Sequence, residues 1–405
     1  MFWRGQRGTL FWLALKTGAL TILTLGFYRF WMKTRLRRWY WSAIRPDGLP
    51  LEYVGQPVEK LMGFLIAVVV LAFYLGVVNL ILMFVSFSLL AAPGAGYALS
   101  FVGVIPLWFY ARYRARRYVL ARTRWRGIRF GVLAGAWGYA MRALVWWLGT
   151  IVTLGLLHPK MRFALEKFRI DRTVWGSVQL EQGGSARMLY PHFAHVMIGL
   201  FLTLAPLIDA VNAVSGLADA SGTGRLFLML LVGVPWLIYG LVRYDVMGRK
   251  VMANAIRTSG AGGGIGFDAA PRTARMVRIV VLGNIARLFG AMIPVLVFTI
   301  AIGAVIAASG MDAGVLDSPF DLLMLGNGPV PGWALLGLLG LAYFGTFLMW
   351  SVLTHVFLTM PVLRHYVETL TLTGADTVGA VVQRDRDEFA EAEGFAEALD
   401  VGAAI

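Results

Sequence analysis

Long apolar runs dominate the hydrophobic pattern of this chain. A spanning helix needs about 20 mostly apolar residues. Six runs meet this requirement: 61–90, 97–111, 191–213, 226–242, 279–308 and 333–361. Two weaker runs, 10–28 and 132–157, are interrupted by Lys16 and Arg142. The pattern predicts an all-α polytopic membrane protein with six clear spans and two further apolar helices.

The composition agrees with this pattern. Of the 405 residues, 58% are hydrophobic and 15% are charged, and the mean hydropathy is +0.69, which is more apolar than a soluble core requires. The absence of cysteine excludes disulfides, thiolate chemistry and cysteine-ligated metal centres. Because Lys16 divides the first run and no small-residue cleavage site follows, we expect the first helix to be retained.

The distribution of charge predicts the orientation. The formal net charge is +15. Most basic residues lie in the connections 31–60, 112–129, 158–190 and 243–278. The other connections are neutral or acidic: 91–96 has no charge, 214–224 has only Asp219, and 309–331 has Asp312, Asp317 and Asp321 without Lys or Arg. Because cytoplasmic loops carry the excess of Lys and Arg, we expect the basic connections and both termini in the cytoplasm.

This orientation separates the strong runs from the weak ones. The strong runs become three hairpins, 61–111, 191–242 and 279–361, each entering and leaving from the cytoplasmic side. The two weak runs have basic residues at both ends, which a single span does not allow. A re-entrant or interfacial helix fits, provided that its break is buried in protein or faces water. Eight ordinary spans are the alternative.

A repeated stretch marks where the weak runs break. TILTLGFYRFWMKT at 21–34 returns as TIVTLGLLHPKMRF at 150–163. Both copies pass from an apolar helix through Thr-Leu-Gly into positive charge. Glycine tolerates a sharp backbone turn. We therefore expect the two weak runs to turn back at Gly26 and Gly155.

A second repeat predicts β-structure. Basic or aromatic helix ends are followed by short alternating runs with turn signals at about 37–55, 116–132, 160–180 and 249–268, and again from residue 364. We expect these hairpins to form a small cytoplasmic β-layer, and the alternative is a set of solvated basic loops. The expected division is a membrane domain at 1–362 and a C-terminal hairpin with an acidic tail at 363–405.

These motifs carry a family resemblance. The element T-x-x-T-L-G-[FL] with Trp31 after it, the run R-R-[WY]-Y and the hairpin x-G-x-x-[LF]-x-[YF] resemble the YjgN family of bacterial inner-membrane proteins, a domain of unknown function. The resemblance implies a multi-pass protein of the bacterial inner membrane. It supplies no activity, cofactor or catalytic residue.

Polar residues inside apolar runs are candidate functional groups, because a charge at the centre of a spanning helix costs about 2.5–3.5 kcal/mol. They are Lys16, Arg142, Asp209, Asn212, Asn284, Arg287 and His355. Asp209 and Asn212 share one helix face, and Asn284 and Arg287 repeat that spacing, so the two pairs are expected to meet across a bundle. They form either a transport site or interhelical hydrogen bonds, with Lys16 and Arg287 extending toward the interface.

Arginines concentrated near the second basic connection predict contact with anionic headgroups, because each basic residue near an anionic membrane contributes about 1 kcal/mol. They are Arg112, Arg114, Arg116, Arg117, Arg122, Arg124 and Arg129. The interleaved Trp and Tyr residues suit nucleic-acid stacking as well. At a membrane surface the headgroup interpretation is simpler, and we expect no nucleic-acid partner.

Other signals are weak. His192, His195 and His355 have the chemistry to hold zinc, but no H-E-x-x-H is present, and interfacial histidines are the better interpretation. The run GAGGGIG from Gly260 lacks the Lys of a phosphate-binding loop and is typical of a flexible segment. We therefore expect no metal and no cofactor.

No constellation specifies a reaction. The leading hypothesis is an inner-membrane protein that binds or transports a lipid or another amphipathic molecule. The alternatives are a scaffold that docks a protein partner or a second copy through its cytoplasmic face and, third, a polytopic membrane enzyme.

Overall fold

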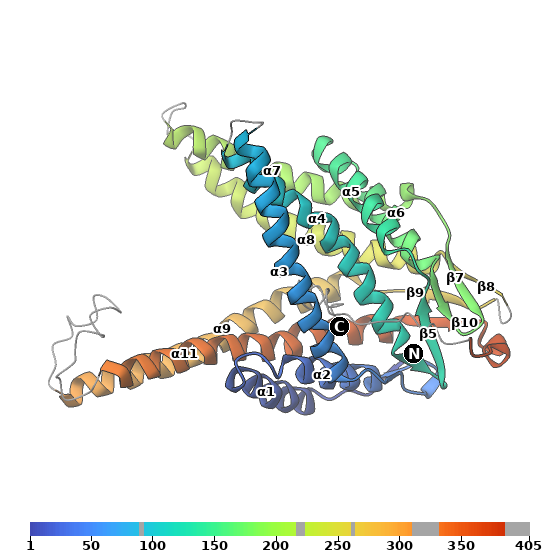
Figure 1. The fold of residues 1–405 in the computed structure, drawn as a ribbon, viewed down its shortest axis with the longest axis horizontal. Coiled ribbons are helices and arrows are strands. Elements are labelled where there is room, and N and C mark those ends of the chain that lie inside the picture. The colour runs from blue at the N-terminus through green and yellow to red at the C-terminus, as the bar shows by residue number, and fades with distance from the viewer. Residues whose placement is uncertain (89–92, 216–222, 261–263, 310–331, 385–405) are drawn as a thin grey trace. The chain divides into compact units, whose positions relative to one another are not determined.

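The computed structural model describes residues 1–88, 93–215, 223–260, 264–309 and 332–384 (Figure 1). They belong to two compact units. The first contains Met1–Arg4, Tyr40–Val277 and the chain from His365, and the second contains Gly5–Trp39 and Arg278–Arg364. The acidic residues expected on the outer side, Asp219, Asp312, Asp317 and Asp321, lie outside the described residues.

Five helices of the described chain are long and apolar enough to cross a membrane. They are Pro57–Ser88, Ala186–Ala205, Leu230–Asn254, Thr273–Ala304 and Gly337–Glu368. They coincide with five of the six strong apolar runs. The sixth run, 97–111, lies in α4 (Pro93–Ala121), whose C-terminal part is rich in arginine. The fold is that of a mostly helical, polytopic membrane protein, and the choice between six and eight spans stays a prediction.

In the first unit, long helices pack as pairs. α3 (Pro57–Ser88) packs against α4, and α7 (Tyr190–Val214) packs against α8 (Thr223–Asn254). Glycines bring the backbones of α7 and α8 together: a Cβ added at Gly199 would lie 2.6 Å from the Leu237 Cα, and one at Gly240 would lie 2.7 Å from the His195 carbonyl oxygen. Small residues at such crossings allow the close packing that holds helices together in lipid.

In the second unit, three helices pack together. They are α1 (Arg7–Leu23), α9 (Thr273–Ser309) and α11 (Gly332–Leu353), and α11 continues as a π-helix (Thr354–Thr359) and α12 (Met360–Glu368). α1 packs against α11, where Gly18 meets the Leu348 side chain. α9 and α11 lie side by side (Figure 1), with Gly283 against the Phe357 carbonyl and Gly290 against Leu353.

An antiparallel six-stranded sheet lies in the first unit, in the order β3-β4-β5-β6-β7-β8. Its strands are β3 (Glu52–Tyr53), β4 (Thr123–Trp125), β5 (Ile128–Val132), β6 (Thr173–Trp175), β7 (Val178–Gln182) and β8 (Ile256–Ser259). Two further pairs form separately: β1 (Phe2–Trp3) with β2 (Ile44–Arg45), and β9 (Gly266–Ala269) with β10 (Leu370–Thr373).

Two of the expected hairpins form as the sequence predicts, β4–β5 and β6–β7. Each begins with a buried threonine that ends the preceding helix: Thr123 Oγ1 donates to the Val119 carbonyl (2.8 Å), and Thr173 Oγ1 donates to the Arg169 carbonyl (2.8 Å). In the first hairpin Arg126 and Gly127 both have positive φ, the combination that matches a two-residue turn to the twist of its strands.

The expected hairpins at 37–55, at 249–268 and from residue 364 are wrong in their pairing. β2 pairs with β1 and β3 pairs with β4, while β8 pairs with β7 and β9 pairs with β10. In the first case, Pro46–Gly48 forms a 3-10 turn with Asp47 at φ 49°, and each flanking strand finds a partner elsewhere in the chain. The alternating pattern correctly located the strands, but it does not determine which strand each one pairs with.

The apolar face of the sheet is covered by the C-terminal segment. Trp125, Trp175 and Val178 pack with Val378 and Val381, and the two indole rings lie 4.8 Å apart. The segment is fixed by hydrogen bonds from the Ser177 N–H to the Val382 carbonyl (2.8 Å) and from the Arg129 N–H to Gln383 Oε1 (2.9 Å). Residues 370–384 are therefore an integral part of the first unit.

Candidate functional site

The two Thr-Leu-Gly elements form the same helix–turn–helix. α1 turns into α2 (Arg29–Ala43), and α5 (Ala136–Val152) turns into α6 (His158–Ile170). Leu25 and Gly26 have φ of 50° and 94°, and Leu154 and Gly155 have φ of 48° and 92°. The duplicated sequence therefore encodes a duplicated backbone conformation.

Backbone hydrogen bonds explain the glycine of the motif. The Gly26 N–H donates to the Thr21 carbonyl and the Gly155 N–H donates to the Thr150 carbonyl, both at 2.7 Å. This bond closes the end of the first helix, and it requires the left-handed conformation that glycine adopts without strain.

The threonines close the turn from both sides. Thr24 Oγ1 donates to the Leu20 carbonyl (2.8 Å) and accepts from the Tyr28 N–H (2.9 Å). Thr153 Oγ1 makes the equivalent bonds to the Gly149 carbonyl (2.8 Å) and from the Leu157 N–H (3.3 Å). The second helix thus begins on the hydroxyl that ends the first, so these hydrogen bonds all lie within the helix–turn–helix itself.

Large apolar side chains project from each turn. We call Leu23, Leu25 and Phe27 the first tip, and Val152, Leu154 and Leu156 the second tip. All six side chains are exposed, and Leu25 and Leu154 are 92% and 87% exposed. A non-glycine residue in the left-handed region costs on the order of 1–3 kcal/mol. Leucine is thus strained in both copies at a position where water alone would favour glycine or asparagine.

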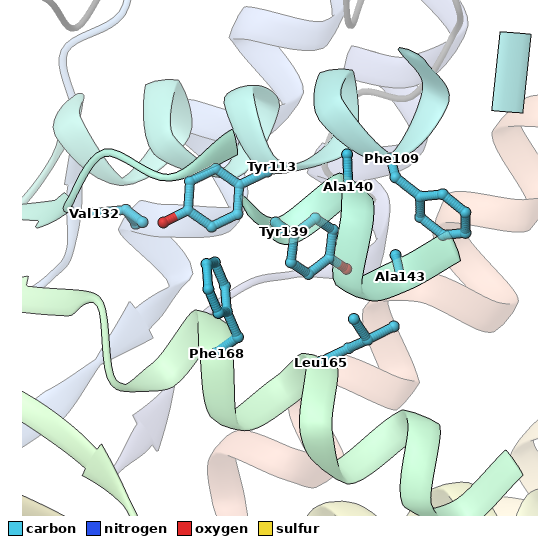
Figure 2. Close-up of a cluster of buried hydrophobic side chains, with 8 residues drawn as sticks. All are labelled: Phe109, Tyr113, Val132, Tyr139, Ala140, Ala143, Leu165 and Phe168. Atoms are coloured by element: carbon cyan, nitrogen blue, oxygen red, sulfur yellow. The ribbon is translucent and has the colours of Figure 1, made fainter. Parts of the chain in front are cut away.

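The second tip continues along one face of α5. Trp137, Met141, Val145 and Leu148 are exposed and stand four or three residues apart, so they form a stripe leading to the tip. The opposite face of α5 is fixed to the protein (Figure 2). Its core residues are Phe109, Tyr113, Val132, Tyr139, Ala140, Ala143, Leu165 and Phe168, from α4, β5, α5 and α6. A rigid support therefore presents an open apolar surface.

The predicted arginine cluster is more constrained than the sequence indicates. Arg112 is exposed, with its guanidinium 5.3 Å from the Trp108 ring centroid, and Arg114 donates to the Tyr110 hydroxyl (3.1 Å). The half-buried Arg122 pairs with Glu59 of α3 at 3.1 Å. The segment 112–129 contains no Asp or Glu of its own, and the acid that neutralises Arg122 comes from the neighbouring helix α3.

The other arginines extend this surface across the sheet. Arg124 and Arg129 are direct partners in the β4–β5 register, and Glu52 stands opposite Arg124 on β3. Arg116 and Arg117 are half-buried near the end of α4. The seven arginines thus lie on α4, on the hairpin β4–β5 or, for Arg122, at the junction between them, while the indoles of Trp125 and Trp175 pack on the sheet face opposite to Arg124 and Arg129.

The polar candidates in apolar runs have different surroundings. Lys16 is exposed on α1, while Arg142 is exposed on α5 with its guanidinium 4.7 Å from the Phe168 ring. Asn284 and Arg287 contact each other, with Nη2 of Arg287 donating to Oδ1 of Asn284 at 2.7 Å. His355 lies in the π-helix.

The other expected pair is Asp209 and Asn212, on α7. The side chain of Asp209 lies outside the description, and Asn212 is half-buried. This pair belongs to the first unit, whereas Asn284 and Arg287 belong to the second. A meeting of the two pairs stays a prediction.

The histidines lie among aromatic rings. His195 lies 6.0 Å from the Trp236 ring and 5.7 Å from the Tyr239 ring. Within the described residues, no group of three or more His, Cys, Asp or Glu side chains is placed to hold a metal ion. His192 and His195 are on α7 of the first unit, and His355 is in the second.

His158, which follows the second tip, is a half-buried residue that the sequence patterns did not predict as functional. Its ring stacks on Phe193 at 5.6 Å and lies 5.5 Å from the Tyr244 ring. Burial lowers the pKa of His158, and the positive charge of Arg162 lowers it further. Arg162 itself pairs with Asp245 of α8 at 3.1 Å. The substitution of LLHPK for FYRFW was the only sequence signal of this contact between α6, α7 and α8.

These features define a multi-pass membrane protein with two apolar-tipped turns and an arginine-rich surface. The chain belongs to a family of bacterial proteins of unknown function, DUF898, because the model of that family matches residues 1–398 of the chain. This agrees with the resemblance found in the motifs at the level of a bacterial domain of unknown function. No curated protein and no solved structure matches the chain.

Proposed function

We propose that this protein binds or transports a lipid, or another amphipathic molecule, in the bacterial inner membrane. In this proposal both tips enter the hydrocarbon from the basic, cytoplasmic side without crossing it. The arginine-rich surface at α4, β4 and β5 contacts the anionic headgroups of the same leaflet.

The observation that carries the proposal is the exposed, strained leucine at each turn. Fully burying a Val, Leu or Phe side chain contributes about 1.5–3 kcal/mol, so moving the six tip side chains from water into hydrocarbon contributes on the order of 10 kcal/mol. That gain offsets the strain at Leu25 and Leu154 several times over. In water the same side chains gain nothing from exposure.

The lengths of the helices support insertion without crossing. α5 has 17 residues, which gives a length of about 25 Å, and the hydrocarbon core is about 30 Å thick. α6 follows directly and carries Lys160, Arg162, Glu166 and Lys167, so it is unsuited to lipid. The turn is exposed rather than buried in protein, but the N–H groups of Leu154, Gly155, Leu156 and Leu157 are all bonded within the motif, which lowers the cost of placing this non-helical backbone in the membrane.

The depth of the tips tests the proposal. Because the chain has no cysteine, single Leu25→Cys and Leu154→Cys variants can carry an environment-sensitive fluorophore in nanodiscs. We expect blue-shifted emission at both positions and strong quenching by lipids brominated along the acyl chains. Val382→Cys is the matched control, because Val382 is also apolar and exposed but lies on the C-terminal segment over the sheet. Emission at Leu25 and Leu154 equal to the control would contradict the proposal.

A further inference from the structure

Among the described residues, the guanidinium of Arg287 in the second unit has no carboxylate partner. Arg287 donates from Nη2 to Asn284 Oδ1 (2.7 Å) and from Nη1 to Thr354 Oγ1 (3.3 Å), and both acceptors are neutral. The described residues of this unit, 5–39, 278–309 and 332–364, contain no Asp or Glu. Their basic residues are Arg7, Lys16, Arg29, Lys33, Arg35, Arg37, Arg38, Arg278, Arg287 and Arg364.

The surrounding groups hold this guanidinium in one place. Thr354 Oγ1 donates to the Trp350 carbonyl (2.6 Å) and Asn284 Nδ2 donates to the Val280 carbonyl (2.7 Å), so both side chains are oriented to accept from Arg287. The Trp350 ring lies against the guanidinium, with its centroid 3.9 Å from Cζ. The buried Nε of Arg287 has no hydrogen-bond partner. A guanidinium held in place by neutral acceptors keeps its full positive charge, which favours an anionic ligand.

Arg287 lies within the candidate span Thr273–Ala304, but the uncharged part of that helix is long enough to cross without it, and we take Arg287 to lie at the edge of the hydrocarbon. Residues 288–308 and 333–353 contain no charged residue, and each run has 21 residues. At 1.5 Å per residue they are about 32 Å long, which matches the hydrocarbon core. One run begins immediately after Arg287, and the other ends immediately before Thr354. Trp350 then occupies the interfacial level that tryptophan prefers.

The backbone is irregular at the same level. The π-helix Thr354–Thr359 begins at the residue that accepts from Arg287. Single π-helical turns inside α-helices frequently occur at functional sites, because the additional residue displaces side chains from their regular positions. An unneutralised charge and an irregular backbone therefore coincide at one point where α9 and α11 pack.

We propose that Arg287 binds the phosphate of an anionic lipid headgroup, with Asn284, Thr354 and Trp350 as positioning residues. The inference rests on the proposed lipid-binding function and adds the chemistry and place of one headgroup. A free phosphate ion has the same recognition chemistry. Arg287 lies beside two uncharged runs of spanning length, where a lipid phosphate is the anion at highest local concentration.

Native mass spectrometry of the full chain tests this site. The protein would be released from nanodiscs of zwitterionic lipid containing a small share of phosphatidylglycerol, and retained anionic lipid would be counted. We expect Arg287→Gln to weaken retention of one phosphatidylglycerol about tenfold, the factor typical of one lost charge-assisted hydrogen bond. Arg278→Gln removes a charge from the same helix and is expected to retain wild-type binding. Equal retention by wild type and Arg287→Gln would overturn the assignment.

A second variant separates binding from folding. Asn284→Asp keeps the size of the side chain and gives Arg287 a carboxylate partner, so we expect a folded protein that loses the same lipid. Circular dichroism checks the helices of each variant. Retention of the lipid by a folded Asn284→Asp protein would overturn the assignment in the same way.

Two further arms separate the remaining outcomes. Excess soluble glycerol phosphate should leave the lipid bound. If glycerol phosphate displaced the lipid, the site would instead bind free phosphate. The tip-depth measurement uses other residues and another readout. Loss of the headgroup site with deeply placed tips would therefore refute only the assignment to Arg287.

Discussion

Replacing the strained leucine of the second tip by asparagine distinguishes a tip in lipid from a tip in water. Asparagine is close to leucine in size and tolerates the left-handed conformation better. The turn is closed by Thr150, Thr153 and Gly155, none of which uses the Leu154 side chain. Leu154→Asn therefore changes the polarity of the tip while leaving its hydrogen bonds intact.

The two environments predict opposite signs. In water the substitution relieves part of the backbone strain, so the free energy of unfolding stays equal or rises by up to about 1 kcal/mol. In hydrocarbon it loses about 1.5–3 kcal/mol of leucine burial and adds a desolvation cost of about 1–3 kcal/mol for the amide. With the relief of strain subtracted, we expect Leu154→Asn to lower the free energy of unfolding by about 2–5 kcal/mol.

The assay is equilibrium unfolding in lipid bicelles, with Arg126→Asn as the matched control. Arg126 also has positive φ (53°) and is exposed, but it lies at the β4–β5 turn of the sheet. The control loses its ion pair with Asp47, an exposed contact that typically contributes less than about 1 kcal/mol. Changes of the same small size in both variants would refute the placement of the tip in hydrocarbon.

Three further predictions concern the rest of the molecule. The pKa of His158 is lowered in the folded protein, so its contribution to stability is present above about pH 6.5 and is lost as the pH falls further. The Tm of the wild type should therefore drop more between pH 7.5 and pH 5 than the Tm of His158→Phe. Parallel curves for the two proteins would contradict this prediction. Gly199→Ala places a Cβ against the Leu237 backbone and should lower the unfolding free energy by about 1–3 kcal/mol in bicelles, so a neutral result would exclude this α7–α8 contact. Replacing Arg122, Arg124 and Arg129 together by Gln should weaken binding to anionic nanodiscs at low salt. The difference should be smaller at high salt, because charges near the surface are screened over about 8 Å at physiological ionic strength. Equal binding at all salt concentrations would contradict this prediction.

Local patterns in the sequence predicted the features that depend on local interactions. The turns at Leu25-Gly26 and Leu154-Gly155 follow from the repeated motif, because the backbone bonds and the Thr24 and Thr153 bonds that close them join residues within five positions. The long apolar helices follow from composition, and the β4–β5 hairpin follows from alternation with Arg126-Gly127 as its turn.

Features that depend on distant residues were not accessible from the sequence. β3 pairs with β4 some 70 residues later, and Arg122 pairs with Glu59 of another helix. Counting charge by segment hid that ion pair, because the acid belonged to a different connection. The pairing of Asn284 with Arg287 could be seen in the helical spacing of the sequence. Thr354 and Trp350 become neighbours of Arg287 only because α9 packs against α11.

Tips that enter the membrane without crossing it leave the residues on both sides of the second turn on the same side of the membrane. Arg126 precedes α5 and Lys160 follows it, and both are exposed. Single cysteines at these two positions would be labelled with a membrane-impermeant thiol reagent in intact cells and in inverted membrane vesicles. We predict protection of both positions in cells and labelling of both in inverted vesicles. Labelling of one position from each side would show that α5 spans the membrane and would contradict the claim.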